Sequence, residues 1–315
     1  MKIVSCFSDI KELGPLAEAG ADEFYTAARE LPAFHSGELP LARLPGAIRL
    51  AHSLGRKISV AVNALLATAT VRQLAAVEKS VRRLDEAGAD SFIFASPYLL
   101  RMFSAPGRKL RAALHLSSVQ PVFNSRAAAF FSRFGVSRFI LPNQLDPREA
   151  GPLLAFCRGR GIETEIFDYR FFGCVYVNGR CQLHKPGHYT TRRGLPEGAM
   201  CRVSAGAGGL VRPLPPELPR RAAELPALLA RLERRLTPCG APRFSDAAAF
   251  FDLLSAGVGY LKYGTRRDAP AAKVSKVRAM RAMISLAEGL RARLPAAAAR
   301  REFIAEMSRW NGGGL

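Results

Sequence analysis

The stretch EAGADSFIF (residues 86–94) decides the fold class, because it joins the end of one element to the start of another. Before it, residues 71–87 carry apolar side chains at helical spacing, with acidic residues near the end. Gly88 suits the left-handed position that closes a helix, and the apolar run after it suits a strand buried on both faces. The stretch therefore predicts a helix–glycine–strand unit of an α/β protein.

The same join recurs along the chain. It is found in EAGADEFY (18–25), SLGRKISVAV (53–62), RFGVSRFIL (133–141), GRGIETEIF (159–167) and SAGVGYLKYG (255–264). With an opening strand at Ile3–Cys6 and another near Leu114–Leu116, about eight βα units are expected, the count of a (β/α)8 TIM-like barrel. An open doubly wound sheet is the weaker alternative, because no Gly-rich phosphate loop follows the first strand. We expect residues 1–315 to form one (β/α) barrel domain.

The composition of the chain limits its expected cellular compartment and binding partners. No run approaches the roughly 18 apolar residues of a membrane span, and the N-terminus reaches acidic residues too soon for a signal peptide. We therefore expect a cytoplasmic protein, whose six cysteines are metal ligands, catalytic groups or buried thiols rather than a disulfide scaffold. The net charge of +20 favours polyanions such as RNA, an anionic membrane surface or small polycarboxylates. The arginines are dispersed, so a solvated basic surface is favoured over a dedicated nucleic-acid face.

In a barrel of this kind, functional residues lie just after the strands, at the C-terminal face. The residues that meet this criterion are Tyr25, Asn63, His115 with Ser117 and Gln120, Asn143, Asp168 and Lys262.

The βα rhythm stops at about residues 172–237, which we expect to be an irregular insertion that carries function. Cys174, Cys181, Cys201 and Cys239 lie in it or just beyond it, separated by six, nineteen and thirty-seven residues. This spacing alone leaves a [4Fe–4S] cluster, zinc and unliganded thiols open, with His184 and His188 as alternative ligands. Cys6 and Cys157 sit in apolar runs and are expected to be small buried hydrophobes.

Several segments together resemble the collagenase-like peptidase family U32. AGADEFYTA (19–27) resembles the family's AGADAVYLG, ISVAVNALL (58–66) its VYVTVNTLL, and LHLSSVQPVFNS (114–125) its IHASTQMNVTNS. The family signature is matched by Glu165-Ile166-Phe167, Gly173-Cys174 and Gly179-Arg180-Cys181, and the late segment LKIEGR by residues 261–266. Gly264 replaces the glutamate of LKIEGR, and Asp168–Phe172 stands where the family has a short His-Gly turn.

Within that family the cysteine layout is most similar to the UbiU-type iron–sulfur proteins of oxygen-independent ubiquinone hydroxylation. The resemblance implies a [4Fe–4S] cluster on Cys174, Cys181, Cys201 and Cys239, and a prephenate-linked hydroxylation carried out with a second family member as a heterodimer. A quinone precursor or another small molecule is the expected acceptor, because the chain ends soon after its barrel. Hydroxylation of tRNA or rRNA, and a noncatalytic cluster-bearing partner, are the alternatives.

Residue roles complete the hypothesis. Lys262 and Arg266 offer fixed cations for a dicarboxylate such as prephenate, and Asn63 and Tyr25 are further candidates for substrate contact. His115 could transfer protons near neutral pH, and Glu165 could orient a ligand or the cluster loop. The sequence contains no Ser-His-Asp order and no HExxH, so peptidase activity is not expected.

Overall fold

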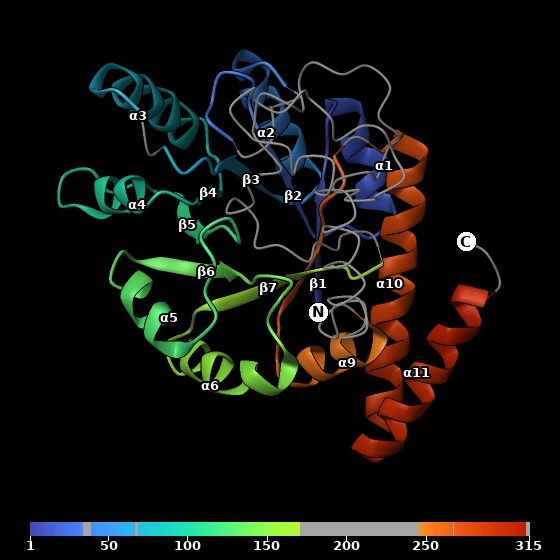
Figure 1. The fold of residues 1–315 in the computed structure, drawn as a ribbon. Coiled ribbons are helices and arrows are strands. Elements are labelled where there is room, and N and C mark those ends of the chain that lie inside the picture. The colour runs from blue at the N-terminus through green and yellow to red at the C-terminus, as the bar shows by residue number, and fades with distance from the viewer. Residues whose placement is uncertain (34–38, 67–68, 171–245, 267, 313–315) are drawn as a thin grey trace, which may run out of the picture.

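Eight parallel strands close into a barrel in the computed structural model, which describes residues 1–33, 39–66, 69–170, 246–266 and 268–312 (Figure 1). Each strand pairs with the next along the chain, and the last pairs with the first. The strands are β1 (Lys2–Cys6), β2 (Glu23–Thr26), β3 (Lys57–Val62), β4 (Ser91–Phe94), β5 (Ala113–Leu116), β6 (Val136–Ile140), β7 (Glu163–Phe167) and β8 (Tyr260–Tyr263). The expected (β/α)8 barrel is confirmed.

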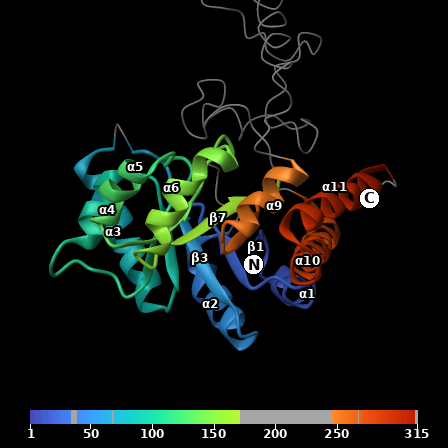
Figure 2. The same ribbon diagram turned by 90° about the horizontal axis from the view of Figure 1, so that it is seen from below.

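Helices surround the barrel and return the chain from one strand to the next (Figures 1 and 2). Their bounds are η1 (Ile10–Glu12), α1 (Leu13–Glu18), η2 (Leu41–Arg43), α2 (Leu44–Ser53), α3 (Val71–Glu86), α4 (Pro97–Ser104), α5 (Ser125–Ser132), α6 (Pro147–Arg158), α9 (Ala247–Ser255), α10 (Pro270–Arg293) and α11 (Ala296–Gly312). α11 folds back against α9 and α10, where Phe303 lies against Phe250 and Phe251, with ring centroids 5.7 and 5.3 Å apart.

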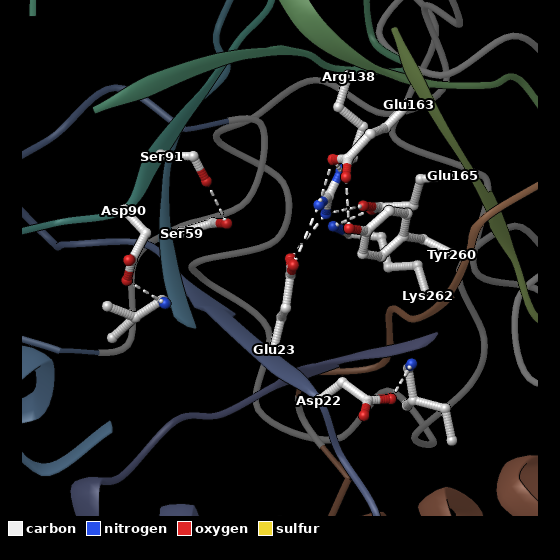
Figure 3. Close-up of polar contacts among 12 residues, drawn as sticks. Asp22, Glu23, Ser59, Asp90, Ser91, Arg138, Glu163, Glu165, Tyr260 and Lys262 are labelled. Atoms are coloured by element: carbon white, nitrogen blue, oxygen red, sulfur yellow. Dashed lines mark hydrogen bonds and ion pairs between the residues drawn. The ribbon is translucent and has the colours of Figure 1, made fainter. Parts of the chain in front are cut away.

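The repeated join has a physical basis that the structure makes visible. Gly88 and Gly257 close their helices with φ values of 93° and 96°, which side chains rarely adopt. In the two Gly-Ala-Asp copies, the aspartate ties neighbouring strands together. Asp22 accepts a hydrogen bond from the Ile3 backbone N–H at 2.7 Å, and Asp90 accepts one from that of Ile58 at 2.8 Å (Figure 3). Each copy thus ends a helix and pins the strand beside it.

The strands alternate between a mostly apolar outer face and an inner face that carries most of the charged side chains. Register partners in parallel strands point to the same side, and the pairing places one row of residues toward the barrel axis. That inner row contains Cys6, Glu23, Tyr25, Ser59, Ser91, Ile93, His115, Arg138, Glu165 and Lys262. The outer row, with residues such as Phe24, Ile58, Phe92 and Leu261, is buried under the helices. The strands are buried on both faces as predicted, and the inner row mixes these charged and polar side chains with apolar ones such as Val4, Ala61 and Ile140.

Other sequence expectations have different outcomes. Cys6 and Cys157 are buried as expected, and burial raises the pKa of both thiols to about 11. The expected insertion at about 172–237, Cys174, Cys181, Cys201 and Cys239, and the two alternative histidines lie outside the described residues. In the part of the chain that the structure describes, no helix combines the length and the apolar character needed to cross a bilayer.

Candidate functional site

Arg138 lies at the centre of a buried ion network inside the barrel (Figure 3). Its Nη1 and Nη2 donate to the two carboxylate oxygens of Glu23 at 2.7 and 3.1 Å, across the barrel from β6 to β2. The same guanidinium donates to Glu163 Oε2, through Nη2 at 2.7 Å, and to Glu165 Oε2, through Nη1 at 3.1 Å. Arg138 is only 3% exposed, so these carboxylates replace its water.

Tyr260 completes the side of this network nearest the N-terminal ends of the strands. Its hydroxyl donates to Glu163 Oε1 at 2.6 Å, and its ring lies 3.4 Å from the Arg138 guanidinium. Burial opposes ionisation of Glu163, but the Tyr260 hydroxyl and the Arg138 charge outweigh it and lower the pKa of this carboxyl. Burial likewise opposes the charge of Arg138, while Glu23 and the neighbouring carboxylates hold its pKa above the usual value. Both groups are therefore ionised at neutral pH.

Lys262 and Glu165 form a second buried pair nearer the C-terminal ends of the strands. The Lys262 Nζ donates to Glu165 Oε1 at 2.7 Å, and the two side chains are 4% and 1% exposed. Burial lowers the pKa of Lys262, and Glu165 only partly counteracts it. A lysine of lowered pKa releases its proton more readily than an exposed one, so Lys262 can act as a proton donor inside the barrel.

Tyr25 brings Lys262 and Arg266 to one place. The Lys262 Nζ lies 3.7 Å from the centre of the Tyr25 ring, and the Arg266 guanidinium lies 5.3 Å from it. The Arg266 Nη1 is buried and has no hydrogen-bond partner among the described residues. Two cations beside one aromatic ring, one with a donor that has no partner among the described residues, form a site suited to a carboxylate. Glu165, Lys262, Tyr25 and Arg266 are therefore brought together, as the hypothesis requires.

His115 faces the same interior from β5, where it pairs in register with Arg138 of β6. The side chain is 4% exposed, and burial, reinforced by Arg138 and Lys262, holds its pKa well below the usual value. The imidazole is therefore neutral at pH 7. It can accept a proton or a hydrogen bond, but efficient proton transfer near neutral pH, which the sequence suggested, would require a higher pKa.

The opposite side of the interior, on β3 to β5, carries neutral polar groups. The hydroxyls of Ser59 and Ser91 are 2.6 Å apart (Figure 3). Asn63 Nδ2 donates to Ser117 Oγ at 3.1 Å, at the C-terminal ends of β3 and β5. Asn63 thus lies at the expected end of the barrel, where it is hydrogen-bonded to Ser117.

The remaining candidates lie beside the point where the described chain stops after β7. Asp168 is fully buried and accepts hydrogen bonds from Arg170 Nε and Nη2 at 3.1 and 2.7 Å. Asn143 Nδ2 and the Tyr169 hydroxyl are buried without a partner among the described residues, and both residues line a cavity of about 20 Å³. A cavity of this size holds about one water molecule, so it is too small for a substrate.

A metal centre would have to come from elsewhere in the chain. Within the ranges that the structure describes, no group of three or more His, Cys, Asp or Glu side chains could hold a metal ion. The segment 171–245, which contains the four cysteines, begins just beyond the C-terminal end of β7. Four thiols are the number that a [4Fe–4S] cluster takes, so the donor set fits that group in number and type.

Sequence reasoning missed Arg138, Glu23, Glu163 and Tyr260. The signal was present, because each is a polar side chain within or at the start of a short apolar strand. Charges so placed are stable only if another strand supplies the opposite charge. Pairing between β2 and β6, 115 residues apart, requires the closed barrel to be known.

Several known proteins are similar to this chain. The model of peptidase family U32 matches residues 8–201. The tRNA hydroxylation protein P2 of Bacillus subtilis is 31% identical over 134 residues, which cover 42% of this chain and 41% of that relative. The tRNA hydroxylation protein P of Helicobacter pylori is 25% identical over 185 residues, 58% of this chain and 42% of that relative. The chain thus matches less than half the length of either curated relative.

Among solved structures, the U32 peptidase Mk0906 is similar with a TM-score of 0.42 and 13% identity, over 53% of this chain and 68% of that one. The strand order alone establishes the barrel here, and the family follows from the match over more than half of the sequence. The chain belongs to peptidase family U32.

Proposed function

We propose that this chain is a [4Fe–4S] protein of oxygen-independent hydroxylation, which acts on RNA and takes prephenate as the linked co-substrate. The observation that carries the proposal is the convergence of Lys262 and Arg266 on Tyr25, with the Arg266 Nη1 buried and without a partner among the described residues. A dicarboxylate requires such fixed cations, and Arg266 can offer a carboxylate two parallel N–H groups.

The buried groups around this site define what the chain itself contributes. Arg266 binds and orients the first carboxylate, while Lys262, held by Glu165 at 2.7 Å, presents a point charge beside it. Neutral His115 can accept a proton or a hydrogen bond from the bound molecule. Arg138 positions Glu165, and therefore Lys262, without needing contact with the substrate.

The cluster is proposed on Cys174, Cys181, Cys201 and Cys239, which supply four thiols in the segment that follows β7. When bound, such a cluster supplies one-electron transfer. The C-terminal end of β7 faces the same end of the barrel as Lys262, because Phe167 and Lys262 are register partners.

RNA is preferred to a small-molecule acceptor for two reasons. The two curated relatives are named as tRNA hydroxylation proteins, and the chain has a net charge of +20. A quinone precursor remains the competing acceptor, and the same experiment decides between them.

The test is anaerobic purification of the full chain, iron and sulfide analysis, and incubation with prephenate and, in parallel, either total tRNA or a quinone precursor, whose mass is then measured. Nucleosides are then analysed by mass spectrometry. The proposal predicts about four irons and four sulfides per chain, and a nucleoside heavier by one oxygen that forms only with prephenate. A zinc-loaded protein would overturn the proposed cluster. Oxygen gained by a quinone precursor and not by RNA would overturn RNA as the acceptor. Product formed only after a second family member is added would identify the chain as one subunit of the enzyme.

A further inference from the structure

The segment from Ser91 to Leu145 contains no aspartate or glutamate. At the chain's average of 26 acidic residues in 315, a stretch of this length would hold about four or five. The same segment carries seven basic residues, Arg101, Arg108, Lys109, Arg111, Arg126, Arg133 and Arg138. Only Arg138 points into the barrel, where it is paired with carboxylates. The others are exposed.

The structure gathers these exposed cations on one side of the barrel. The segment forms α4 and α5, which follow the adjacent strands β4 and β5, and Figures 1 and 2 both show the two helices on the same side. Of the exposed cations, Arg108 reaches Glu78 of α3 at 3.5 Å. The other five form no ion pair within the described residues, and the segment itself holds no carboxylate that could pair with them.

Exposed aromatic rings lie among the cations. Tyr98 on α4 is 53% exposed, Phe123 before α5 is 36% exposed, and Phe130 on α5 is 43% exposed. Arg126, Phe130 and Arg133 follow each other at intervals of four and three residues, so they share one face of the helix over about 10 Å. Tyr98 and Arg101 are likewise three apart on α4.

Neighbouring side chains pack against the Phe130 ring and fix its position. Its ring meets Phe131 edge-to-face at 5.0 Å and Phe134 at 5.5 Å, and Arg133 lies 4.9 Å from its centre. Arg126 lies in the first turn of α5, where the helix dipole disfavours a cation. Its charge therefore does not stabilise the helix. Exposed arginines without an ion-pair partner can bind the phosphates of RNA, and the exposed rings beside them can stack on its bases.

We propose that the outer face of α4 and α5, built from Tyr98, Arg101, Phe123, Arg126, Phe130 and Arg133, is the surface on which RNA docks. The inference rests on the proposed RNA acceptor and adds the place where it binds. Because α4 and α5 begin just after β4 and β5, Tyr98 and Phe123 lie at the C-terminal rim of the barrel, the end that holds Asn63 and Lys262. An RNA held on this face can reach the anion site over that rim.

The test compares two triple variants of the full chain with equal change of charge. One carries Arg101→Gln, Arg126→Gln and Arg133→Gln. The control carries Arg278→Gln, Arg291→Gln and Arg293→Gln on α10, which are also exposed. Binding to total tRNA is measured by fluorescence anisotropy across a salt series. Loss of three phosphate contacts predicts about 100-fold weaker binding near 0.1 M salt, about tenfold near 0.3 M, and a log–log salt slope reduced by about two.

Phe130→Leu separates stacking from charge. It should weaken tRNA binding about tenfold at every salt concentration, with the slope unchanged. Circular dichroism and the iron content confirm that each variant is folded. Equal weakening by both triple variants would overturn the docking face while leaving RNA hydroxylation intact. Failure of the wild-type chain to bind tRNA would overturn the RNA acceptor itself, and with it this face. Saturable binding to phosphatidylserine vesicles in place of tRNA would assign the face to a membrane surface.

Discussion

The two sides of the barrel interior differ in the charge of their side chains. From β6 through β8 to β2 the side chains are charged, with Arg138, Lys262 and three glutamates linked by short hydrogen bonds. From β3 to β5 they are small or neutral, as in the Ser59 and Ser91 pair and in His115. A charged side without water is stable only while every charge has a partner, whereas neutral hydroxyls tolerate substitution.

Under the proposed function, the charged side is the one that binds the carboxylates. Lys262 and Arg266 on the charged side are positioned for an anion, while the serines opposite add little bulk. The comparison predicts large effects of substitution on one side and small effects on the other.

Arg138→Met should have the largest effect on stability. It leaves Glu23, Glu163 and Glu165 without their shared cation, and removal of one partner from a buried ion pair costs about 3–5 kcal/mol. Urea unfolding of the variant, compared with the exposed control Arg291→Met, measures the loss. An unfolding free energy within about 1 kcal/mol of the wild type would show that the interior network is not essential for stability.

The Glu165 and Lys262 pair should show strong coupling. Glu165→Gln or Lys262→Met alone leaves a buried group without its counter-charge, at about 1–3 kcal/mol each. Because they share one interaction, the double variant should lose less than the sum of the two, by about 1–3 kcal/mol. Additive losses in urea unfolding would mean that the two side chains act independently.

His115 predicts a pH dependence of stability. Its pKa in the folded chain is well below the unfolded value near 6.5, so below that pH the unfolded state binds a proton that the folded state does not. Stability should therefore fall by about 1 kcal/mol between pH 7.5 and pH 5.5 through this residue. His115→Gln should remove that part of the loss in urea midpoints at the two pH values. An unchanged pH dependence in the variant would contradict a neutral buried imidazole.

On the neutral side, the effects should be the smallest. Ser59→Ala removes one hydrogen bond and leaves the Ser91 hydroxyl unsatisfied, which costs about 1 kcal/mol. The double variant Ser59→Ala, Ser91→Ala should be close to the wild type, because no unpaired hydroxyl remains. A double variant as unstable as Arg138→Met would remove the distinction between the two sides.

The sequence was sufficient for the barrel because each βα unit carries its own local signal. Gly88 and Gly257 close helices, and Thr70 with Gln73 caps the start of α3 through reciprocal hydrogen bonds. These signals act over a few residues and need no knowledge of the rest of the chain.

The site was predictable only in part. Lys262, Arg266 and Tyr25 were found because they follow or lie in strands that end at the expected face. Arg138 and Glu23 were missed because their contact joins strands on opposite sides of the barrel. The neutral state of His115 depends on burial and on nearby cations, which a sequence does not display. The outer face of α4 and α5 was not predicted either, because its arginines are spaced apart in the chain and come together only when the helices form.

The charged side is tested most directly as the binding side by titrating the anaerobically purified chain with prephenate. Binding is measured by isothermal titration calorimetry. The wild type should bind saturably, and Arg266→Gln should weaken binding about 10- to 100-fold, the effect of losing a charge-assisted hydrogen-bonded pair. The exposed control Arg291→Gln should bind like the wild type. Prephenate affinity that is the same in Arg266→Gln, Lys262→Met and the wild type would contradict the account.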